Sequence, residues 1–353
     1  MKNNKKNSFV MGSFYELLNK DVKELNGIVI SLFSVLFLVG VGFISYTLTS
    51  NSYALFGDSL TGSKIIEVEA SLPSAVDTII AKVGIDGLVE ETHPATEQLG
   101  AVIDYRYTGA NPNNYVSFNN ELWRIIGVFP TDDGTGNIEN RVKIIRNESI
   151  GDIAWDDDDI NDWSTASLQQ LLNSGDYYNR TGSYTSIGLT EEAKSMISDS
   201  KWYLGGVGDI DNTNYDLTSR KYYEGERGTE VYSGHSISFI GKVGLMYPSD
   251  YGYATGGGST TSREECLAAV LYDWELYSDC FNNDWLYDSS NLQWTMVSYS
   301  YDSDKVFLIN ASGTALNTFA HLSIAVRPAL YLSSDVMITG GTGTSSDPYI
   351  LSK

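Results

Sequence analysis

The sequence predicts an α+β domain preceded by one transmembrane helix, on three observations. Tyr is abundant at 24 residues, Gly numbers 33 and Pro only 7, and short Tyr, Thr and Val runs between Gly, Asn and Asp clusters favour short strands and many turns. Charged residues are 19% of the chain and hydrophobic residues 42%, so a disordered chain is excluded. An uncharged apolar run, residues 28–46, precedes all of this.

That apolar run has the length of a membrane span. Nineteen residues rise roughly 28 Å as a helix, and the predicted transmembrane helix covers 28–48. Lys20 and Lys23 precede it and no Lys or Arg follows until Lys64, so the N-terminus, 1–27, is expected in the cytoplasm and the bulk outside the cell. The alternative is a signal peptide cleaved after Ala54, which the length of the run disfavours.

The charge and the cysteines fit an exported domain. The net charge is −22, and an acidic surface repels phosphate backbones, so nucleic acid is excluded as a partner. Cys266 and Cys280 both follow the apolar run, and two cysteines in an exported domain most often form one disulfide. Such a bridge would contribute about 3 kcal/mol in the chain-entropy model; the alternative is two buried thiols.

The order of elements predicts the domain boundaries. Residues 49–99 are expected to form a juxtamembrane stalk that includes one short amphipathic helix. From residue 100 to 353, strand-like runs come first, among them a hairpin around TDDGTGN; helices follow, then long loops, and strands again. The helix predicted in NDWSTASLQQLLN has Asp162 or Ser164 as its cap. This order is α+β.

Several of these runs together resemble a known family. NNYVSFNNELWRIIGVF, VKIIRNESIG, GLMYPSDYGYA, QWTMVS and VRPALYL resemble an uncharacterised family of Firmicutes surface and secreted proteins, over roughly residues 100–351. The resemblance implies a looped ectodomain similar to the C-type-lectin-like fold of formylglycine-generating enzymes, with Trp294 and Arg327 at its late strands. It implies no catalytic cysteine pair, because the spacing of Cys266 and Cys280 does not match.

No catalytic motif stands out in the chain. His93 lies in the predicted stalk, and His235 lies in GHSIS, which lacks the G-x-S-x-G pattern of a nucleophile elbow. No H-E-x-x-H or phosphate-binding loop occurs. A triad assembled only by the fold stays open, since a triad is recognised by geometry. The expected activity is therefore binding without catalysis.

Two acidic stretches are candidates for calcium, the one cofactor that the sequence suggests. Asp156 and Asp158 belong to the first, and Asp209 and Asp211 to the second. Alternate oxygens at this spacing can point at one cation, but both stretches lack the Gly and Glu of an EF-hand. The alternative is a pair of solvated acidic loops, with Asp162 as a helix cap.

Aromatic residues in loops give the stronger hint of function. Tyr and Trp among Ser, Gly, Asn and Asp are typical of adaptable binding surfaces, and Trp123, Trp163 and Trp294 are expected in the core. The predicted ligand-binding residues are Tyr247, Tyr251, Tyr253, Trp285, Tyr299 and Tyr301. We expect a cell-surface module that binds a glycan or protein partner in adhesion. The alternatives are a structural or pilus-like envelope component that self-associates and, more distantly, an exported hydrolase.

Overall fold

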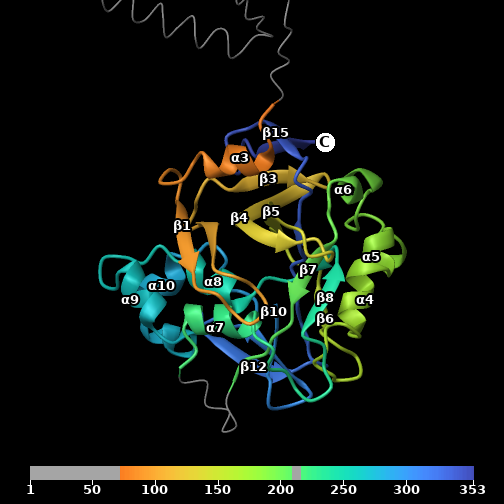
Figure 1. Cartoon of the computed structure of the whole chain (residues 1–353), viewed down its shortest axis with the longest axis vertical. Coiled ribbons are helices and arrows are strands. Elements are labelled where there is room, and N and C mark those ends of the chain that lie inside the picture. Colours follow the sequence, from red (N-terminus) through yellow and green to blue (C-terminus); the bar gives the residue numbers. More distant parts are fainter. Residues whose placement is uncertain (1–71, 209–215) are drawn as a thin grey trace, which may run out of the picture. The chain divides into compact units, whose positions relative to one another are not determined.

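The computed structural model describes residues 72–208 and 216–353, which form one compact unit from Leu72 (Figure 1). This part is α+β and mostly sheet. None of its helices is long and apolar enough to cross a bilayer. The predicted fold class, a C-type-lectin-like ectodomain preceded by one transmembrane helix, is therefore wrong as stated, and the predicted span, 28–48, lies outside the described residues.

The larger sheet has nine strands and is built around one long hairpin. β4 (Glu121–Asp132) pairs antiparallel with β5 (Ile138–Arg146), as the sequence predicts for the runs around TDDGTGN. The strand order is β15 (Met337–Gly340), β16 (Tyr349–Ser352), β3 (Tyr115–Phe118), β4, β5, β14 (Ala329–Tyr331) and β9 (Val243–Gly244).

Two further strands branch from β4. β2 (Val102–Tyr107) pairs with β4, and β1 (Leu88–His93), which falls inside the predicted stalk, pairs with β2 over its whole length. The close approach of β2 to β4 requires Gly127 in β4, because a Cβ at this position would lie 2.0 Å from the Tyr105 carbonyl oxygen of β2. The glycine therefore fixes where β2 leaves the main path of the sheet.

The smaller sheets come from the second half of the chain and from short inserts. Five strands run in the order β12 (Ala315–Phe319), β11 (Lys305–Ile309), β10 (Gln293–Ser298), β13 (Ser323–Ala325) and β6 (Asp152–Ala154). β7 (Ser200–Tyr203) and β8 (Ser238–Gly241) form a separate pair. β10, β11 and β14 occupy the runs predicted as late strands.

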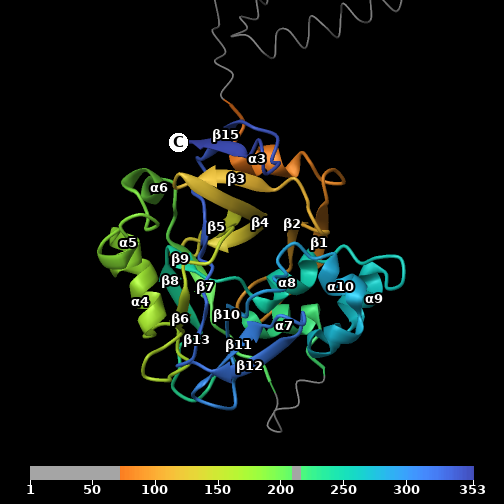
Figure 2. The ribbon, with the colours of Figure 1, turned by 180° about the vertical axis from the view of Figure 1, so that it is seen from behind.

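Short helices flank the sheets on two sides (Figures 1 and 2). On one side lie α4 (Ser167–Asn173), α5 (Asp176–Asn179) and α6 (Glu191–Ser195), joined by η1 (Gly182–Tyr184). On the other lie α7 (Ser219–Glu226), α8 (Pro248–Ala254), α9 (Arg263–Ala268), η2 (Leu271–Leu276) and α10 (Ser278–Asn282). α3 (Ala75–Ile80) lies against β15.

Local sequence sets where these helices begin. Thr218 starts α7 by accepting a hydrogen bond from the Lys221 N–H, and Pro248 stands in the first turn of α8. α4 begins at Ser167, later than predicted, because the Asp162 carboxylate accepts the Ser164 N–H and holds a turn before the helix. The stretch 203–262, expected to be mainly loops, contains α7 and α8.

All the layers share one apolar core. Trp123, Trp163 and Trp294 are buried in it, as predicted from the sequence. Trp155, Trp202 and Trp274 are also fully buried. Large aromatic side chains therefore supply much of the apolar area that stabilises this fold.

Candidate functional site

The predicted ligand-binding aromatic residues do not form a surface group. Tyr247, Tyr251, Tyr253, Trp285 and Tyr299 are buried, and within this set Tyr301 is exposed, at 45%. Each buried ring adds core area and needs a partner for its polar atom. The position of these residues in Gly- and Ser-rich sequence reflects close packing of backbone around large rings.

Their polar atoms tie distant segments together. Tyr247 Oη donates to the Tyr203 carbonyl and accepts the Tyr203 N–H, at 3.0 and 2.9 Å. Tyr251 Oη donates to the Gly313 carbonyl at 2.8 Å. Trp285 Nε1 donates to the Tyr107 carbonyl at 2.8 Å. These bonds are internal, so they hold the fold and leave little of each ring for a ligand.

The first predicted calcium stretch is organised by backbone hydrogen bonds. The buried Asp156 carboxylate accepts the N–H groups of Ile160 and Ser167, both at 2.9 Å, while Asp158 is exposed. Across residues 72–208 and 216–353, no group of three or more His, Cys, Asp or Glu residues could hold a metal ion. Asp209 and Asp211 lie outside the described residues.

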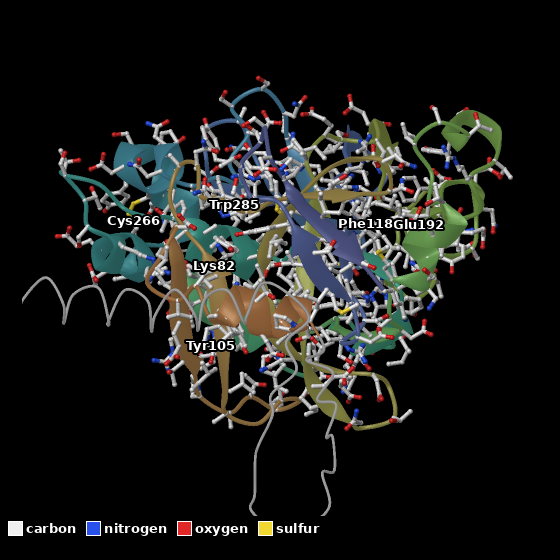
Figure 3. The ribbon with its side chains drawn as sticks, turned by 90° about the horizontal axis from the view of Figure 1, so that it is seen from above. Lys82, Tyr105, Phe118, Glu192, Cys266 and Trp285 are labelled. Atoms are coloured by element: carbon white, nitrogen blue, oxygen red, sulfur yellow. A yellow bond between two sulfur atoms is a disulfide. The ribbon has the colours of Figure 1, made fainter. Side chains whose placement is uncertain are left out.

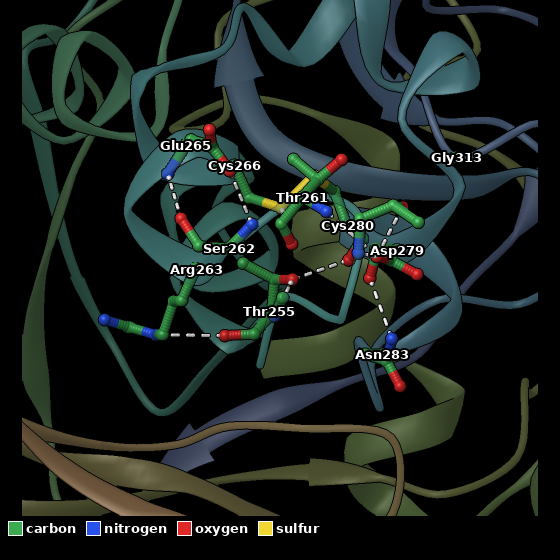
Figure 4. Close-up of a disulfide and its surroundings, with 12 residues drawn as sticks. Thr255, Thr261, Ser262, Arg263, Glu265, Cys266, Asp279, Cys280, Asn283 and Gly313 are labelled. Atoms are coloured by element: carbon green, nitrogen blue, oxygen red, sulfur yellow. Dashed lines mark hydrogen bonds between the residues drawn. A yellow bond between two sulfur atoms is a disulfide. The ribbon is translucent and has the colours of Figure 1, made fainter.

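The disulfide between Cys266 and Cys280 is confirmed (Figure 4). Both cysteines are fully buried and link α9 to α10. Around them, the Thr255 hydroxyl donates to the Cys280 carbonyl at 2.6 Å. The Asp279 carboxylate accepts two N–H groups of the preceding loop, from Thr260 and Thr261. The segment from α9 to α10 is therefore held rigidly at both ends.

Two buried arginines are the next candidate for a functional site, one in a strand of the larger sheet and one directly before another of its strands. Arg124, in β4, is 6% exposed and Arg327, just before β14, is 9% exposed. The Arg124 guanidinium stacks on the rings of Tyr115, at 4.2 Å, and Trp285, at 4.5 Å. Its Nε donates to the Asn114 side-chain oxygen at 2.8 Å.

Arg327 is held by neutral acceptors. Its Nε donates to the Arg146 carbonyl at 2.9 Å and its Nη1 to the Gln293 side-chain oxygen at 3.0 Å. Gln293 is itself buried and donates to the Leu286 carbonyl. The hydrogen-bond partners of Arg327 are thus an amide oxygen and a backbone carbonyl.

Neither guanidinium forms an ion pair with a described carboxylate. Burial, together with the nearby charge of Arg327, lowers the pKa of Arg124 to about 10, and burial likewise lowers the pKa of Arg327 to about 10. The carboxyl close to Arg124 is Asp284, and burial raises its pKa well above its usual range, which favours the neutral acid. The charges of Asp288 and Glu148 oppose this lowering at Arg327 without forming an ion pair with it. Within the described chain, neither guanidinium is in direct contact with a carboxylate.

Elsewhere in the core, buried cations are paired. Asp250 Oδ2 lies 2.5 Å from Lys143 Nζ, and Asp250 Oδ1 lies 3.2 Å from Arg106 Nη1. Arg106 also forms a two-point contact with Asp104, at 2.8 and 3.0 Å. All four side chains are fully buried, which fits the rule that buried charges are paired. Arg124 and Arg327 depart from that rule.

The paired network continues through His93 and Tyr223. His93 Nε2 lies 3.1 Å from Asp104 Oδ2, and the His93 ring stacks on Tyr223 at 3.7 Å. The Arg227 guanidinium also lies 3.7 Å from the Tyr223 ring centre and contacts Glu226 at 2.7 Å. Two groups cannot share one face of a ring at this distance, so His93 and Arg227 take opposite faces.

A cavity of about 570 Å³ lies apart from both arginines. Its carboxylates are Glu97, Glu224 and Glu230, and the remaining lining residues are small: Ala95, Thr96, Gly206, Gly225, Gly228 and Thr229. Hydrogen bonds from Thr229 lower the pKa of Glu97. The cavity contains none of the predicted aromatic residues.

We call Tyr115, Arg124, Trp285, Gln293 and Arg327 the arginine site. The sequence pointed to Trp285 as a ligand-binding residue and to Arg327 as notable, but it missed Arg124. The available signal was a charged residue inside the apolar run WRIIGVF, where a buried strand should carry none. Figure 3 labels Trp285, one residue of the arginine site.

No family model, no curated protein and no solved structure matches this chain.

Proposed function

We propose that this protein is an exported binding module that recognises an acidic ligand at the arginine site and acts without catalysis. The observation that supports it is the pair of buried guanidiniums, Arg124 and Arg327, neither of which forms an ion pair or hydrogen bond with a carboxylate of the described chain. The disulfide between Cys266 and Cys280 favours an oxidising compartment outside the cytoplasm.

This arrangement of the two arginines carries an energetic cost. An unpaired buried charge carries a desolvation penalty of several kcal/mol, and two like charges near one another add repulsion. A fold that only needed stability would place apolar side chains here. An anion bound between the arginines would supply the missing counter-charge, so the free site favours such a ligand.

The chemistry of the site indicates which anion. A guanidinium offers N–H donors in a planar fork that matches carboxylate, sulfate or phosphate oxygens. Arg124 Nη2 donates to the Pro112 carbonyl at 3.5 Å. Arg124 Nη1 and Arg327 Nη2 make no hydrogen bond to a described residue. The half-buried ring of Tyr115 adds a flat apolar surface at the same place. We therefore propose a carboxylate-bearing saccharide, such as an oligomer of uronic acids, as the ligand.

Thermal unfolding of the full chain with a set of matched compounds tests the proposal. The set pairs uronic-acid oligomers with neutral oligomers of equal length, and peptides that end in a free carboxylate with amidated ones; sodium sulfate is included. A ligand of the folded state raises the unfolding temperature. We expect a rise with the uronic-acid oligomers and none with their neutral counterparts.

Two variants locate the effect. Arg327→Lys should lose the rise, because an ammonium cannot reproduce the two-point contact of a guanidinium. Arg220→Gln should keep it, since Arg220 is exposed and pairs with Glu224. A rise with the peptides alone would replace the saccharide by a polypeptide end. No rise with any compound, together with self-association, would favour the structural alternative instead.

A further inference from the structure

A second surface, separate in its residues from the arginine site, lies on the disulfide-linked segment. Leu276, at the end of η2, is 73% exposed, and the adjacent Tyr277 is 39% exposed. Tyr272, one turn earlier, is exposed as well. An exposed leucine alone needs no explanation, but three large side chains within six residues form a local apolar surface.

The frame beneath these side chains is rigid. Leu271 and Trp274, in the same short helix, are fully buried, and Trp274 packs on Tyr251 at 5.2 Å between ring centres. The disulfide between Cys266 and Cys280 encloses the whole helix. Leu276 and Tyr277 are thus presented on a fixed support, so little conformational entropy would be lost when they contact a partner.

The charge around this surface has one sign. Between Arg263 and Lys305 the sequence contains no Lys, Arg or His and nine acidic residues. Glu264, Glu265 and Glu275 are exposed, and Asp273 is partly exposed beside them. An apolar centre with an acidic rim matches a partner that combines apolar and basic side chains.

An open sheet edge adjoins the same segment. β12 is the last strand of the five-stranded sheet in the described chain, and it lies beside η2. Ser312, just before β12, donates to the Glu275 carboxylate of η2 at 3.5 Å, so the start of β12 meets this surface. Edge strands accept an added strand through their backbone groups, while alternate side chains select the partner. An extended segment could therefore pair with β12 and reach the apolar side chains of η2.

We infer that Leu276, Tyr277 and the surrounding carboxylates, beside the start of β12, form a docking site for a basic, partly apolar polypeptide segment. A second copy of this chain is disfavoured as the occupant, because each copy carries a net charge of −22 and the two would repel each other. A membrane surface is disfavoured for the same reason, since anionic lipids attract basic segments.

The test uses a short labelled peptide of alternating lysine and leucine and measures its fluorescence anisotropy with the full chain. A peptide of alternating lysine and serine is the probe for charge alone. We expect saturable binding of the first peptide, and at least about tenfold weaker binding to the double variant Leu276→Ser, Tyr277→Ser, as for an apolar hot spot. The matched control, Ile103→Ser, removes an exposed apolar side chain from β2 and should change the affinity less than about twofold.

Charge variants separate a defined site from general attraction. Asp273→Asn with Glu275→Gln should weaken binding, whereas Asp157→Asn with Asp158→Asn, two exposed acids before α4, should not. Equal weakening by both pairs, or equal binding of the two peptides, would overturn the proposal. So would a dimer of the protein alone that dissociates in the Leu276→Ser variant, because the occupant would then be a second copy.

Discussion

The Lys143 ammonium lies 2.5 Å from the Asp250 carboxylate inside the core of this domain, and both side chains are fully buried. The same carboxylate contacts Arg106 and accepts the Tyr247 N–H at the start of α8. One anion thus serves two cations and a helix end. Among the described residues, Arg124 and Arg327 have no such partner. Removing a charge from a paired and from an unpaired buried group should therefore have different effects on stability.

Asp250→Asn should be strongly destabilising. The amide keeps the shape of the side chain but removes the charge, so Lys143 and Arg106 lose their shared partner. Breaking a buried pair from one side costs about 3–5 kcal/mol, measured as a loss in the free energy of unfolding by urea denaturation. The control is Asp335→Asn, because Asp335 pairs with Lys353 at the surface; it should cost less than about 1 kcal/mol.

Arg124→Met should cost far less than its burial suggests. Methionine keeps apolar contact with Tyr115 and Trp285 and removes the cost of a buried charge that forms no ion pair in the described chain. It also leaves the buried Asn114 side-chain oxygen without its donor, which costs about 1–3 kcal/mol, so the two effects oppose each other. We expect a net loss of no more than about 2 kcal/mol in the free energy of unfolding of the ligand-free protein. A loss as large as that of Asp250→Asn would mean that Arg124 has a structural role.

Acid should weaken the fold through His93. Burial lowers the pKa of His93, against the opposing effect of its hydrogen bond to Asp104. Because its pKa is lower in the folded state, the unfolded chain binds the proton first as pH falls below about 6.5. His93 therefore contributes stability that is present above about pH 6.5 and is lost as pH falls toward its folded pKa.

The measurement for His93 compares two proteins across the same pH range. Urea denaturation of wild type and His93→Gln, between about pH 7.5 and 5, should show a steeper loss of stability in the wild type. Parallel curves would mean that His93 takes up its proton equally in both states. Comparing the two curves removes the contributions that both proteins share.

The disulfide should support the segment that carries Leu276. The double variant Cys266→Ala, Cys280→Ala should lose about 3 kcal/mol in the chain-entropy model. A reducing agent should produce a similar loss in the wild type and none in the variant. If the variant is as stable as the wild type, the bridge contributes nothing to the fold and its support of η2 must be tested by proteolysis instead.

Tyr251→Phe distinguishes a core role from a ligand-binding role. The change removes only the hydroxyl that donates to the Gly313 carbonyl, and a lost buried hydrogen bond costs about 1 kcal/mol. We expect that loss in the free energy of unfolding and unchanged binding of any ligand that protects the wild type. Weaker binding without a loss of stability would restore the role predicted from sequence.

Some of this fold follows from local sequence. The β4–β5 hairpin follows from two strand-like runs, and the burial of Trp123, Trp163 and Trp294 follows from residue type. The disulfide is expected from the presence of two cysteines in a domain predicted to be exported. Tyr247 and Tyr251 are predicted from the sequence to bind a ligand but are buried, and this difference has a physical cause. Gly and Ser beside a tyrosine are equally typical of a binding loop and of a tightly packed interior. In both cases the backbone must come close to a large ring, which small residues allow.

The arginine site could not be predicted because its members come from distant positions. Arg124 lies in β4, Trp285 follows α10 and Arg327 precedes β14, and only the sheet brings them together. A charge within an apolar run signals a buried polar contact. Whether that charge is paired, as for Lys143, or unpaired, as for Arg124, depends on residues that are distant in the sequence.

The most direct test of the proposed function is a calorimetric titration of the full chain with a uronic-acid oligomer, repeated with Arg124→Lys. We predict saturable binding to the wild type and at least about tenfold weaker binding to the variant, because a bidentate contact is lost. Equal binding by both proteins would place the ligand elsewhere, and no binding to the wild type would contradict the assignment of the arginine site to an acidic saccharide.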